Sequence, residues 1–128
     1  RGQLTDMRKR ILAVEDNDIN LEILIEILES LGCQATGAEH GKQALEILAD
    51  EEPFDAVLMD IHMPVMDGFE TTKAIREMAG DLCRIPIIAL TGESLIEERS
   101  YAAKIGMNGF ITKPVTAGQM KEVLEGIV

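Results

Sequence analysis

The sequence is poor in positive charge and in cysteine. It has 12 lysines and arginines against 23 aspartates and glutamates, so its formal net charge is −11. A nucleic-acid surface needs clustered Lys and Arg to neutralise phosphates, and an anionic membrane attracts basic segments. We therefore expect neither nucleic-acid binding nor membrane contact. The two cysteines, Cys33 and Cys83, show no CxxC spacing, which argues against a zinc site and against a disulfide framework.

Long hydrophobic runs are also missing. The longest apolar segments have four or five residues, far fewer than the roughly 20 that a transmembrane helix needs. The hydrophobic region of a signal peptide does not precede the first apolar run either. These two absences favour a cytoplasmic location.

The size and composition fit one globular domain. The chain has 128 residues and a mass of 14.0 kDa, which suits a single hydrophobic core. With 46% hydrophobic and 27% charged residues it is an ordinary folded sequence. Residues 1–7 show no periodicity and are expected to be a tail or the stub of a linker, with the domain at residues 8–128.

Short apolar runs alternate with helical patterns along the chain. Asn17 and Asp18 form a helix start, and Gly32 suits the end of that helix. Ser94 with Glu97 resembles a capping box for a later helix. The strands are expected at Ile11–Val14, Cys33–Ala38, from Asp55, at Ile85–Leu90 and at Gly109–Thr112. The helices are expected from Asp18 to Leu31, Gly41 to Asp50, Phe69 to Met78, Ser94 to Ile105 and Gln119 to Val128.

The apolar runs are continuous rather than alternating, which is typical of strands covered on both faces. Five such strands alternating with five helices predict an α/β fold. Right-handed crossovers then give a doubly wound parallel sheet flanked by helices on each side.

Polar residues stand where four of these runs end. Glu15-Asp16, Asp60, Thr91 and Lys113-Pro114 follow or close the runs. The carboxyl ends of parallel strands meet at one edge of the sheet, which is where open α/β folds bind ligands. That edge would hold three carboxylates, a hydroxyl and an ammonium group. This set indicates a divalent cation site beside a phosphoryl site.

The chemistry of these groups supports the same interpretation. Two or three carboxylates around a hard cation describe a Mg²⁺ site, to which Asp16 and Asp60 could bind directly and Glu15 through water. A carboxylate such as Asp60 can also accept a phosphoryl group as a nucleophile. Lys113 and Thr91 would then neutralise the remaining phosphoryl oxygens.

The chain resembles the receiver domains of two-component response regulators over about residues 10–128. The matching motifs, in order, are Val14-Glu15-Asp16-Asn17, Met59-Asp60-Ile61-His62-Met63-Pro64 with Met66-Asp67-Gly68, Ala89-Leu90-Thr91-Gly92, and Phe110-Ile111-Thr112-Lys113-Pro114. The resemblance implies a flavodoxin-like sheet with strand order 2-1-3-4-5. It also implies that the domain catalyses its own phosphorylation and dephosphorylation.

The resemblance implies a role for each site residue. Asp60 would be the phosphoacceptor, and Mg²⁺ would be held by Asp16, Asp60, the backbone carbonyl of His62 and, with an assisting role, Glu15. Lys113, Thr91 and the backbone N–H of Gly92 would bind the phosphoryl group. Phe110 would be the switch aromatic, and the Lys113–Pro114 peptide would be cis. His62 and Glu93 would flank the path of a hydrolytic water.

The string from Val14 to Asn20 is similar to receivers attached to hybrid sensor histidine kinases. The phosphoryl donor would then be a phosphohistidine on a kinase dimerisation domain or a histidine phosphotransfer domain. A homodimer formed on phosphorylation is a further expectation. In the hybrid case, the domain would be the cytoplasmic part of a membrane-bound sensor kinase.

Three alternatives stay open at this point. The chain could be a stand-alone single-domain response regulator, or a degenerate receiver that only binds protein. From another class, it could be a Mg²⁺-dependent phosphatase with an aspartyl nucleophile, of the haloacid-dehalogenase type. Such phosphatases place a second Asp two residues after the nucleophile, where this chain has His62.

Overall fold

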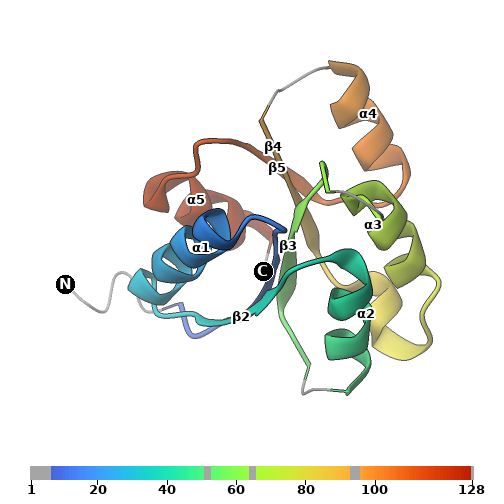
Figure 1. Cartoon of the computed structure of the whole chain (residues 1–128), viewed down its shortest axis with the longest axis horizontal. Coiled ribbons are helices and arrows are strands. Elements are labelled where there is room, and N and C mark those ends of the chain that lie inside the picture. Colours follow the sequence, from blue (N-terminus) through green and yellow to red (C-terminus); the bar gives the residue numbers. More distant parts are fainter. Residues whose placement is uncertain (1–6, 51–52, 64–65, 93–95, 128) are drawn as a thin grey trace.

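The computed structural model describes residues 7–50, 53–63, 66–92 and 96–127, and these form one α/β domain (Figure 1). The strands are β1 (Arg10–Val14), β2 (Gln34–Ala38), β3 (Ala56–Asp60), β4 (Ile87–Thr91) and β5 (Gly109–Thr112). The helices are α1 (Asp18–Ser30), α2 (Gly41–Asp50), α3 (Gly68–Arg76), α4 (Ile96–Lys104) and α5 (Ala117–Ile127), with a short 3₁₀ helix, η2 (Gly80–Arg84), before β4.

The five strands form one parallel sheet in the order β2-β1-β3-β4-β5. Helices α1 and α5 cover one face, and α2, α3 and α4 cover the other (Figure 1). The predicted fold class and strand order are therefore confirmed. Because β3 lies between β1 and β4, the ends of these three strands are direct neighbours at the carboxyl edge of the sheet.

Each face of the sheet carries its own half of the core, because side chains alternate along a strand. In β3, Val57 and Met59 pack toward α2, α3 and α4, whereas Ala56 and Leu58 pack toward α1 and α5. All residues of β3 and β4 are buried. This explains why their sequences read as unbroken apolar runs.

The predicted start and end of α1 agree with the structure. Asn17 is the N-cap residue, and its side chain accepts a hydrogen bond from the N–H of Asn20. Leu31 is the C-cap, and Gly32 follows at a φ of 85°, a conformation that glycine adopts without steric penalty.

Other predicted boundaries differ by a few residues. Helix α3 begins at Gly68, because Asp67 and Glu70 form a capping box, and it ends at Arg76 rather than Met78. Strand β4 begins only after Pro86, which has no N–H to donate to a neighbouring strand. The 3₁₀ helix η2 was not expected. The Ser94 cap lies outside the described residues.

Helix α1 does not bury all of its isoleucines. Leu21, Leu24 and Leu28 face the core, whereas Ile19 is 69% exposed and Ile23 is 45% exposed. The predicted helical spacing of these residues is confirmed, but Ile19 and Ile23 form an apolar patch on the surface. They lie in the first two turns of α1, next to the carboxyl edge of the sheet.

At its N-terminal end the described chain begins with Met7. Its N–H donates to the carbonyl of Leu31, and its partly buried side chain packs against the α1 and α5 half of the core. The division between tail and domain at residue 8 stays a prediction. Among the described residues, no helix is both long enough and apolar enough to cross a membrane.

Candidate functional site

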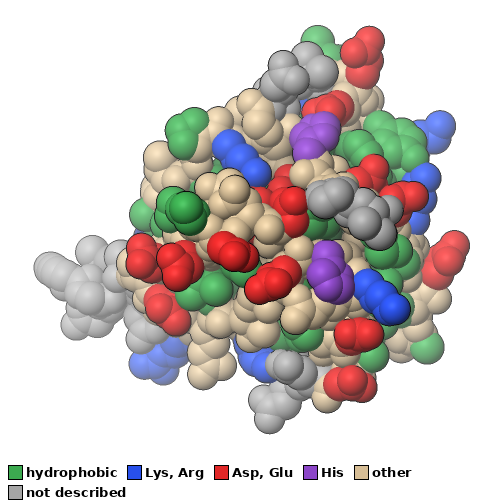
Figure 2. All heavy atoms as spheres, in the orientation of Figure 1, with side chains coloured by type: hydrophobic (Ala, Val, Ile, Leu, Met, Phe, Trp, Pro, Cys, Tyr) green, Lys and Arg blue, Asp and Glu red, His purple; other side chains and the backbone are tan. Residues whose placement is uncertain are grey.

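The carboxyl edge of the sheet brings together residues that are far apart in the sequence. Glu15 and Asp16 directly follow β1, Asp60 is the last residue of β3, and Lys113 directly follows β5. Oxygen atoms of Glu15, Asp16 and Asp60 lie within 4.8 Å of one another. Figure 2 shows acidic side chains spread over most of the face drawn, including its middle. The three carboxylates form a cluster at this edge.

Burial makes this cluster unusual. Glu15 is 2% exposed and Asp60 is 3% exposed, whereas Asp16 is on the surface. Buried carboxylates lose hydration and repel one another, so they need a cation or hydrogen-bond donors nearby. Oxygen ligands of this kind and number suit a hard divalent cation. The residues present therefore fit a metal site that is open to solvent on the side of Asp16.

Glu15 shows the electrostatic consequence of this crowding. Burial raises the pKa of the Glu15 carboxyl, the neighbouring Asp60 raises it further, and Lys113 acts in the opposite direction. Glu15 also accepts hydrogen bonds from Lys113 Nζ at 3.0 Å and from the N–H of Asn17 at 3.3 Å. A perturbed carboxyl in a charged cleft marks a candidate functional site.

Asp60 is held by two neighbours. Its Oδ1 accepts a hydrogen bond from the N–H of His62 at 3.0 Å, and its Oδ2 lies 3.6 Å from Lys113 Nζ. The Lys113–Pro114 peptide is cis, as the resemblance implied, and the N–H of Lys113 donates to the carbonyl of Thr91. The ammonium group of Lys113 is thus shared between Glu15 and Asp60, and it lies closer to Glu15.

The start of α3 packs directly onto the backbone of Asp60. A Cβ placed on Gly68 would lie 2.4 Å from the carbonyl oxygen of Asp60 and 2.6 Å from the Cα of Ile61. The N–H of Gly68 also donates to the carbonyl of Ile61. Glycine is therefore required at this position for α3 to begin beside the site.

Thr91 lies on the face of the sheet opposite to the one that α1 and α5 cover. Alternation along β4 places it, like Ile87 and Ala89, on the face covered by α2, α3 and α4. It is fully buried, and its hydroxyl donates a long hydrogen bond of 3.4 Å to Oε1 of Glu98 in α4. Gly92, the next residue, is exposed and has open space around its Cα.

Phe110 lies on the same side as Thr91. Its ring is partly buried against the α2, α3 and α4 half of the core, and the guanidinium group of Arg99 lies 5.2 Å from the ring centre. This position suits an aromatic residue that contacts both β5 and α4. Its role as a switch stays a prediction.

Sequence reasoning missed Glu98. Its second carboxylate oxygen lies 3.1 Å from Nε2 of His62, a side chain that is 59% exposed. Glu98 therefore connects α4 to both the loop after β3 and the end of β4. A glutamate in the first turn of a helix is common, and its spacing from Thr91 carries no recognisable sequence signal.

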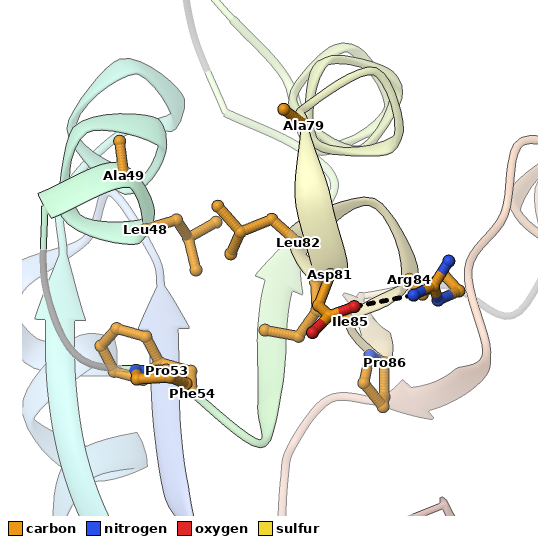
Figure 3. Close-up of a pocket in the computed structure, with 10 residues that line it drawn as sticks. All are labelled: Leu48, Ala49, Pro53, Phe54, Ala79, Asp81, Leu82, Arg84, Ile85 and Pro86. Carbon is orange, nitrogen blue, oxygen red and sulfur yellow. Dashed lines mark hydrogen bonds and ion pairs between the residues drawn. The ribbon is translucent and has the colours of Figure 1, made fainter.

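A cavity lies at the opposite edge of the sheet, where β3 and β4 begin. It has a volume of about 550 Å³ and is lined mainly by apolar side chains, among them Leu48, Phe54, Leu82 and Ile85 (Figure 3). The ionisable residues in its lining, Asp81 and Arg84, are exposed and form an ion pair with each other. Charged groups suited to phosphoryl chemistry are thus concentrated at the other edge.

The fold and the acidic pocket together define a class of protein. The family model for the response regulator receiver domain matches residues 11–125. The chain therefore belongs to the receiver domain family of two-component systems. This assignment favours the receiver over the phosphatase that the sequence had left open.

The most similar curated relatives include histidine kinases. The sensor histidine kinase GacS of Pseudomonas protegens is 35% identical over 123 residues, which cover 94% of this chain and 13% of the relative. Hybrid signal transduction histidine kinase A of Dictyostelium discoideum is 38% identical over 119 residues, which cover 91% of this chain and 6% of the relative. The chain thus spans only a small part of the curated relatives it matches.

Solved structures agree. The receiver domain of the sensor histidine kinase PA1611 from Pseudomonas aeruginosa, solved with a magnesium ion in its active-site cleft, has a TM-score of 0.83 and 36% identity. The match covers 94% of this chain and 97% of that one. The chemotaxis protein CheY4 of Vibrio cholerae has a TM-score of 0.88 and 29% identity, covering 94% of this chain and 99% of that one.

Proposed function

We propose that this domain takes a phosphoryl group from a phosphohistidine onto Asp60 and relays it as an aspartyl phosphate. One observation carries the proposal. Asp60 is a buried carboxylate at a strand end, with the carboxylates of Glu15 and Asp16 beside it and the ammonium group of Lys113 at 3.6 Å. Such a site can neutralise a phosphoryl group and also present a nucleophile to it.

The transfer exchanges one phosphorus bond for another. A carboxylate oxygen of Asp60 attacks the phosphorus, the P–N bond to the donor imidazole breaks, and a new P–O bond forms. The imidazole nitrogen keeps the electron pair of the broken bond and can then take up a proton. Loss of the phosphoryl group follows when water attacks phosphorus, which frees the Asp60 carboxylate and inorganic phosphate.

Asp16 and Asp60, with the His62 carbonyl and an assisting Glu15, would hold Mg²⁺. The fit of the carboxylate cluster to a hard cation supports this assignment, as does the magnesium ion in the related PA1611 receiver. When bound, the ion would neutralise charge on phosphoryl oxygens.

The remaining groups would hold the phosphoryl oxygens that face away from the carboxylates. Lys113 is already placed beside Asp60, and its ammonium group can donate to an oxygen there. Thr91 ends the neighbouring strand β4 and Gly92 follows it, and the Thr91 hydroxyl and the N–H of Gly92 would bind a further oxygen. Phe110 would respond to the movement of Thr91, because both lie on the α4 side of the sheet.

The surface beside the site suggests how the donor docks. A pocket of about 460 Å³ lies between α1 and the β5–α5 loop and is lined by residues that include Glu15, Lys113, Ile23 and Val115. Ile23, which lines this pocket, and the exposed Ile19 form the apolar patch of α1. The patch therefore lies beside the pocket, next to Glu15 and Lys113. We propose that a helix of the donor, carrying the phosphohistidine, packs on this patch.

We further propose that the parent protein is a hybrid sensor histidine kinase and that the exchange takes place in the cytoplasm. The relatives GacS and hybrid kinase A support this, because they carry a matching receiver within a much longer chain. CheY4, of which this chain covers 99%, favours a stand-alone regulator as the second candidate. Formation of a homodimer on phosphorylation belongs to the same proposal and can be measured by sedimentation velocity.

Intact mass after incubation with acetyl phosphate and Mg²⁺ tests the proposal. We expect one phosphoryl adduct on the unaltered protein, none on Asp60→Asn, and an undiminished adduct on Asp18→Asn, a control that removes an exposed carboxylate of α1. Absence of an adduct on the unaltered protein, or an adduct that survives in Asp60→Asn, would overturn it. Rapid turnover of an added phosphomonoester would favour a phosphatase instead.

A further inference from the structure

Glu98 links three parts of the molecule that the proposed function requires to move relative to one another. It lies in the first turn of α4, and its side chain is 21% exposed. One carboxylate oxygen accepts the hydroxyl proton of Thr91 at 3.4 Å, and the other lies 3.1 Å from His62 Nε2. The backbone N–H of His62 in turn donates to Asp60. Glu98 is therefore linked to the acceptor through His62, and it also contacts Thr91 at the end of the neighbouring strand β4.

The Thr91 hydroxyl has a single proton to donate. In the structure the Glu98 carboxylate is an acceptor within reach of this proton, at 3.4 Å from the hydroxyl oxygen. In the phosphorylated state of the proposed function the proton is directed to a phosphoryl oxygen. Both acceptors cannot hold it at the same time, so the phosphoryl group and Glu98 compete for one donor.

Repulsion between the phosphoryl group and the Glu98 carboxylate would also weaken the contact between Glu98 and Thr91. The carboxylate of Glu98 lies beside Thr91, which follows the strand partner of Asp60, and beside His62, whose backbone N–H donates to Asp60. A phosphoryl group carries a charge of about −1.5 to −2 near neutral pH, so it repels a partly buried carboxylate. Arrival of the group at Asp60 would weaken the hold of Glu98 on Thr91.

Helix α4 buries little of its surface. Among its described residues, Ala102 is the one that is fully buried. Tyr101 packs edge-on against Phe69 of α3, and Arg99 lies over the ring of Phe110. A helix with so small a buried face depends on its polar contacts to fix its first turn.

From these contacts we propose that Glu98 is a positioning residue: it holds Thr91 and the first turn of α4 in the resting arrangement, and the phosphoryl group on Asp60 displaces it. The inference rests on the proposed function of Asp60. Glu98 itself takes no part in the transfer of the phosphoryl group. Its carboxylate resists both the approach of an anionic donor and the turn of Thr91 toward the site.

Phosphorylation kinetics test the effect of the charge. Glu98→Gln keeps the size of the side chain and an oxygen that can accept from Thr91, but it removes the negative charge. With acetyl phosphate and Mg²⁺, initial uptake measured by intact mass should rise by about 3- to 10-fold, and the rise should shrink at high salt. Glu97→Gln removes the same charge from the neighbouring exposed position and should change uptake by less than about 2-fold.

Hydrogen exchange tests the hold on α4 without any phosphorylation. In the resting protein, Glu98→Ala should speed amide exchange in residues 96–104, whereas Glu97→Ala should leave it unchanged. Phosphorylation of the unaltered protein should produce the same acceleration, and Glu98→Ala should show little further change. If Glu98 only contributed to overall stability, phosphorylation and Glu98→Ala would not both speed amide exchange in the same residues of α4.

The outcomes separate the two proposals. If the unaltered protein is phosphorylated on Asp60 while the Glu98 and Glu97 variants behave alike in uptake and exchange, the inference about Glu98 is wrong and the proposed function stands. If no adduct forms on Asp60, the proposed function fails. In that case, equal exchange in the resting Glu98→Ala and unaltered proteins would also reject the hold on α4.

Discussion

The ammonium nitrogen of Lys113 lies 3.0 Å from Oε1 of Glu15, a residue 98 positions earlier in the chain. The same nitrogen lies 3.6 Å from Oδ2 of Asp60. One cation thus partly compensates two buried carboxylates. The pair shows why the acidic cluster can exist in the folded domain before any metal or phosphoryl group arrives.

Replacing this cation should weaken both the fold and the reaction. In Lys113→Ala, two buried carboxylates lose their positive neighbour, so the free energy of unfolding should fall by about 1 to 3 kcal/mol, less than for a fully buried pair because Lys113 is partly exposed. Lys121→Ala, which removes a surface partner of Glu125 in α5, should change it by less than about 1 kcal/mol. Urea unfolding monitored by circular dichroism gives both values. Equal losses in the two variants would contradict this account.

Phosphoryl uptake by Lys113→Ala should be slower but not abolished, since Asp60 remains as the nucleophile. The phosphorylated variant should no longer show the exchange change in residues 96–104 that phosphorylation produces in the unaltered protein. Hydrogen exchange on samples with matched phosphoryl occupancy makes this comparison. An unchanged response would show that Lys113 does not connect the phosphoryl group to the rest of the domain.

Much of this site could be predicted from the sequence because its residues come at the ends of strands. Unbroken apolar runs identify β1, β3 and β4 as strands buried on both faces, and their parallel arrangement then brings Asp16 and Asp60 to one edge. The contact between Glu98 and Thr91 could not be predicted in the same way. It depends on where α4 begins and on a side-chain direction, and neither follows from spacing.

The surface of α1 shows a second feature that the sequence does not predict. Helical spacing identifies a stripe of apolar residues but does not say how wide the covered part of the helix is. The structure buries Leu24 and leaves Ile23, the preceding residue, 45% exposed. Packing against the sheet and against α5, which is about 100 positions away in the sequence, sets that boundary.

A divalent cation should stabilise the domain through the carboxylate cluster. Added Mg²⁺ at about 100 times its dissociation constant should raise the free energy of unfolding by about 2.7 kcal/mol. In Asp16→Asn the increment should be largely lost, whereas Asp18→Asn, which lies outside the cluster, should keep it. Thermal unfolding with and without Mg²⁺ measures the increment. A full increment in Asp16→Asn would remove Asp16 from the site.

Glu15 should make stability depend on pH when no divalent cation is present. Burial and Asp60 raise the pKa of Glu15 in the folded state, so the folded domain holds this proton more tightly than the unfolded chain. The stabilising contribution of the protonated form is fully present below the ordinary glutamate pKa and is lost as pH rises through the raised value. Glu15→Gln should therefore be more stable than the unaltered protein at neutral pH, and this advantage should disappear at low pH. Chemical unfolding at a series of pH values, in the presence of a chelator, tests the sign.

The start of α3 should tolerate no side chain at Gly68. Gly68→Ala places a methyl group against the backbone of Asp60 and Ile61, which cannot move away as a flexible side chain would. We expect a loss of about 2 kcal/mol or more in the free energy of unfolding, and slower phosphoryl uptake because the Asp60 backbone shifts. Gly118→Ala, at the start of α5 with open space around it, should be neutral or stabilising by up to about 1 kcal/mol. Similar losses in both variants would show that helix starts, rather than the contact with Asp60, account for the effect.

Replacing Arg76, even by lysine, should lower the free energy of unfolding. Its guanidinium group donates five hydrogen bonds, to the carbonyls of Gly106, Cys83 and Ile85 and to the side chain of Asn108. Lysine cannot reproduce this planar set of donors, so Arg76→Lys should lower the free energy of unfolding by about 2 to 4 kcal/mol. Arg84→Lys alters an exposed pair with Asp81 and should change it by less than about 1 kcal/mol. Denaturant unfolding of the two variants measures both values. If the dependence of the free energy on denaturant concentration is the same in both, the midpoints can be compared directly.

The exposed isoleucines of α1 should matter for a protein donor and not for a small one. Ile19→Asp places a charge in the apolar patch beside the acceptor, where a donor helix is proposed to pack. Transfer from a histidine phosphotransfer domain should slow by about 10-fold or more, because a buried apolar anchor is replaced by a charge that binding would desolvate. Uptake from phosphoramidate, which has the same P–N bond, should stay within about 2-fold, since so small a donor has no protein surface to pack on Ile19. Ile96→Asp, which changes an isoleucine of α4 that is also exposed, should leave both rates unaltered. If Ile19→Asp and Ile96→Asp slowed the protein donor equally, the docking surface would extend to α4, and the patch on α1 would not be its centre.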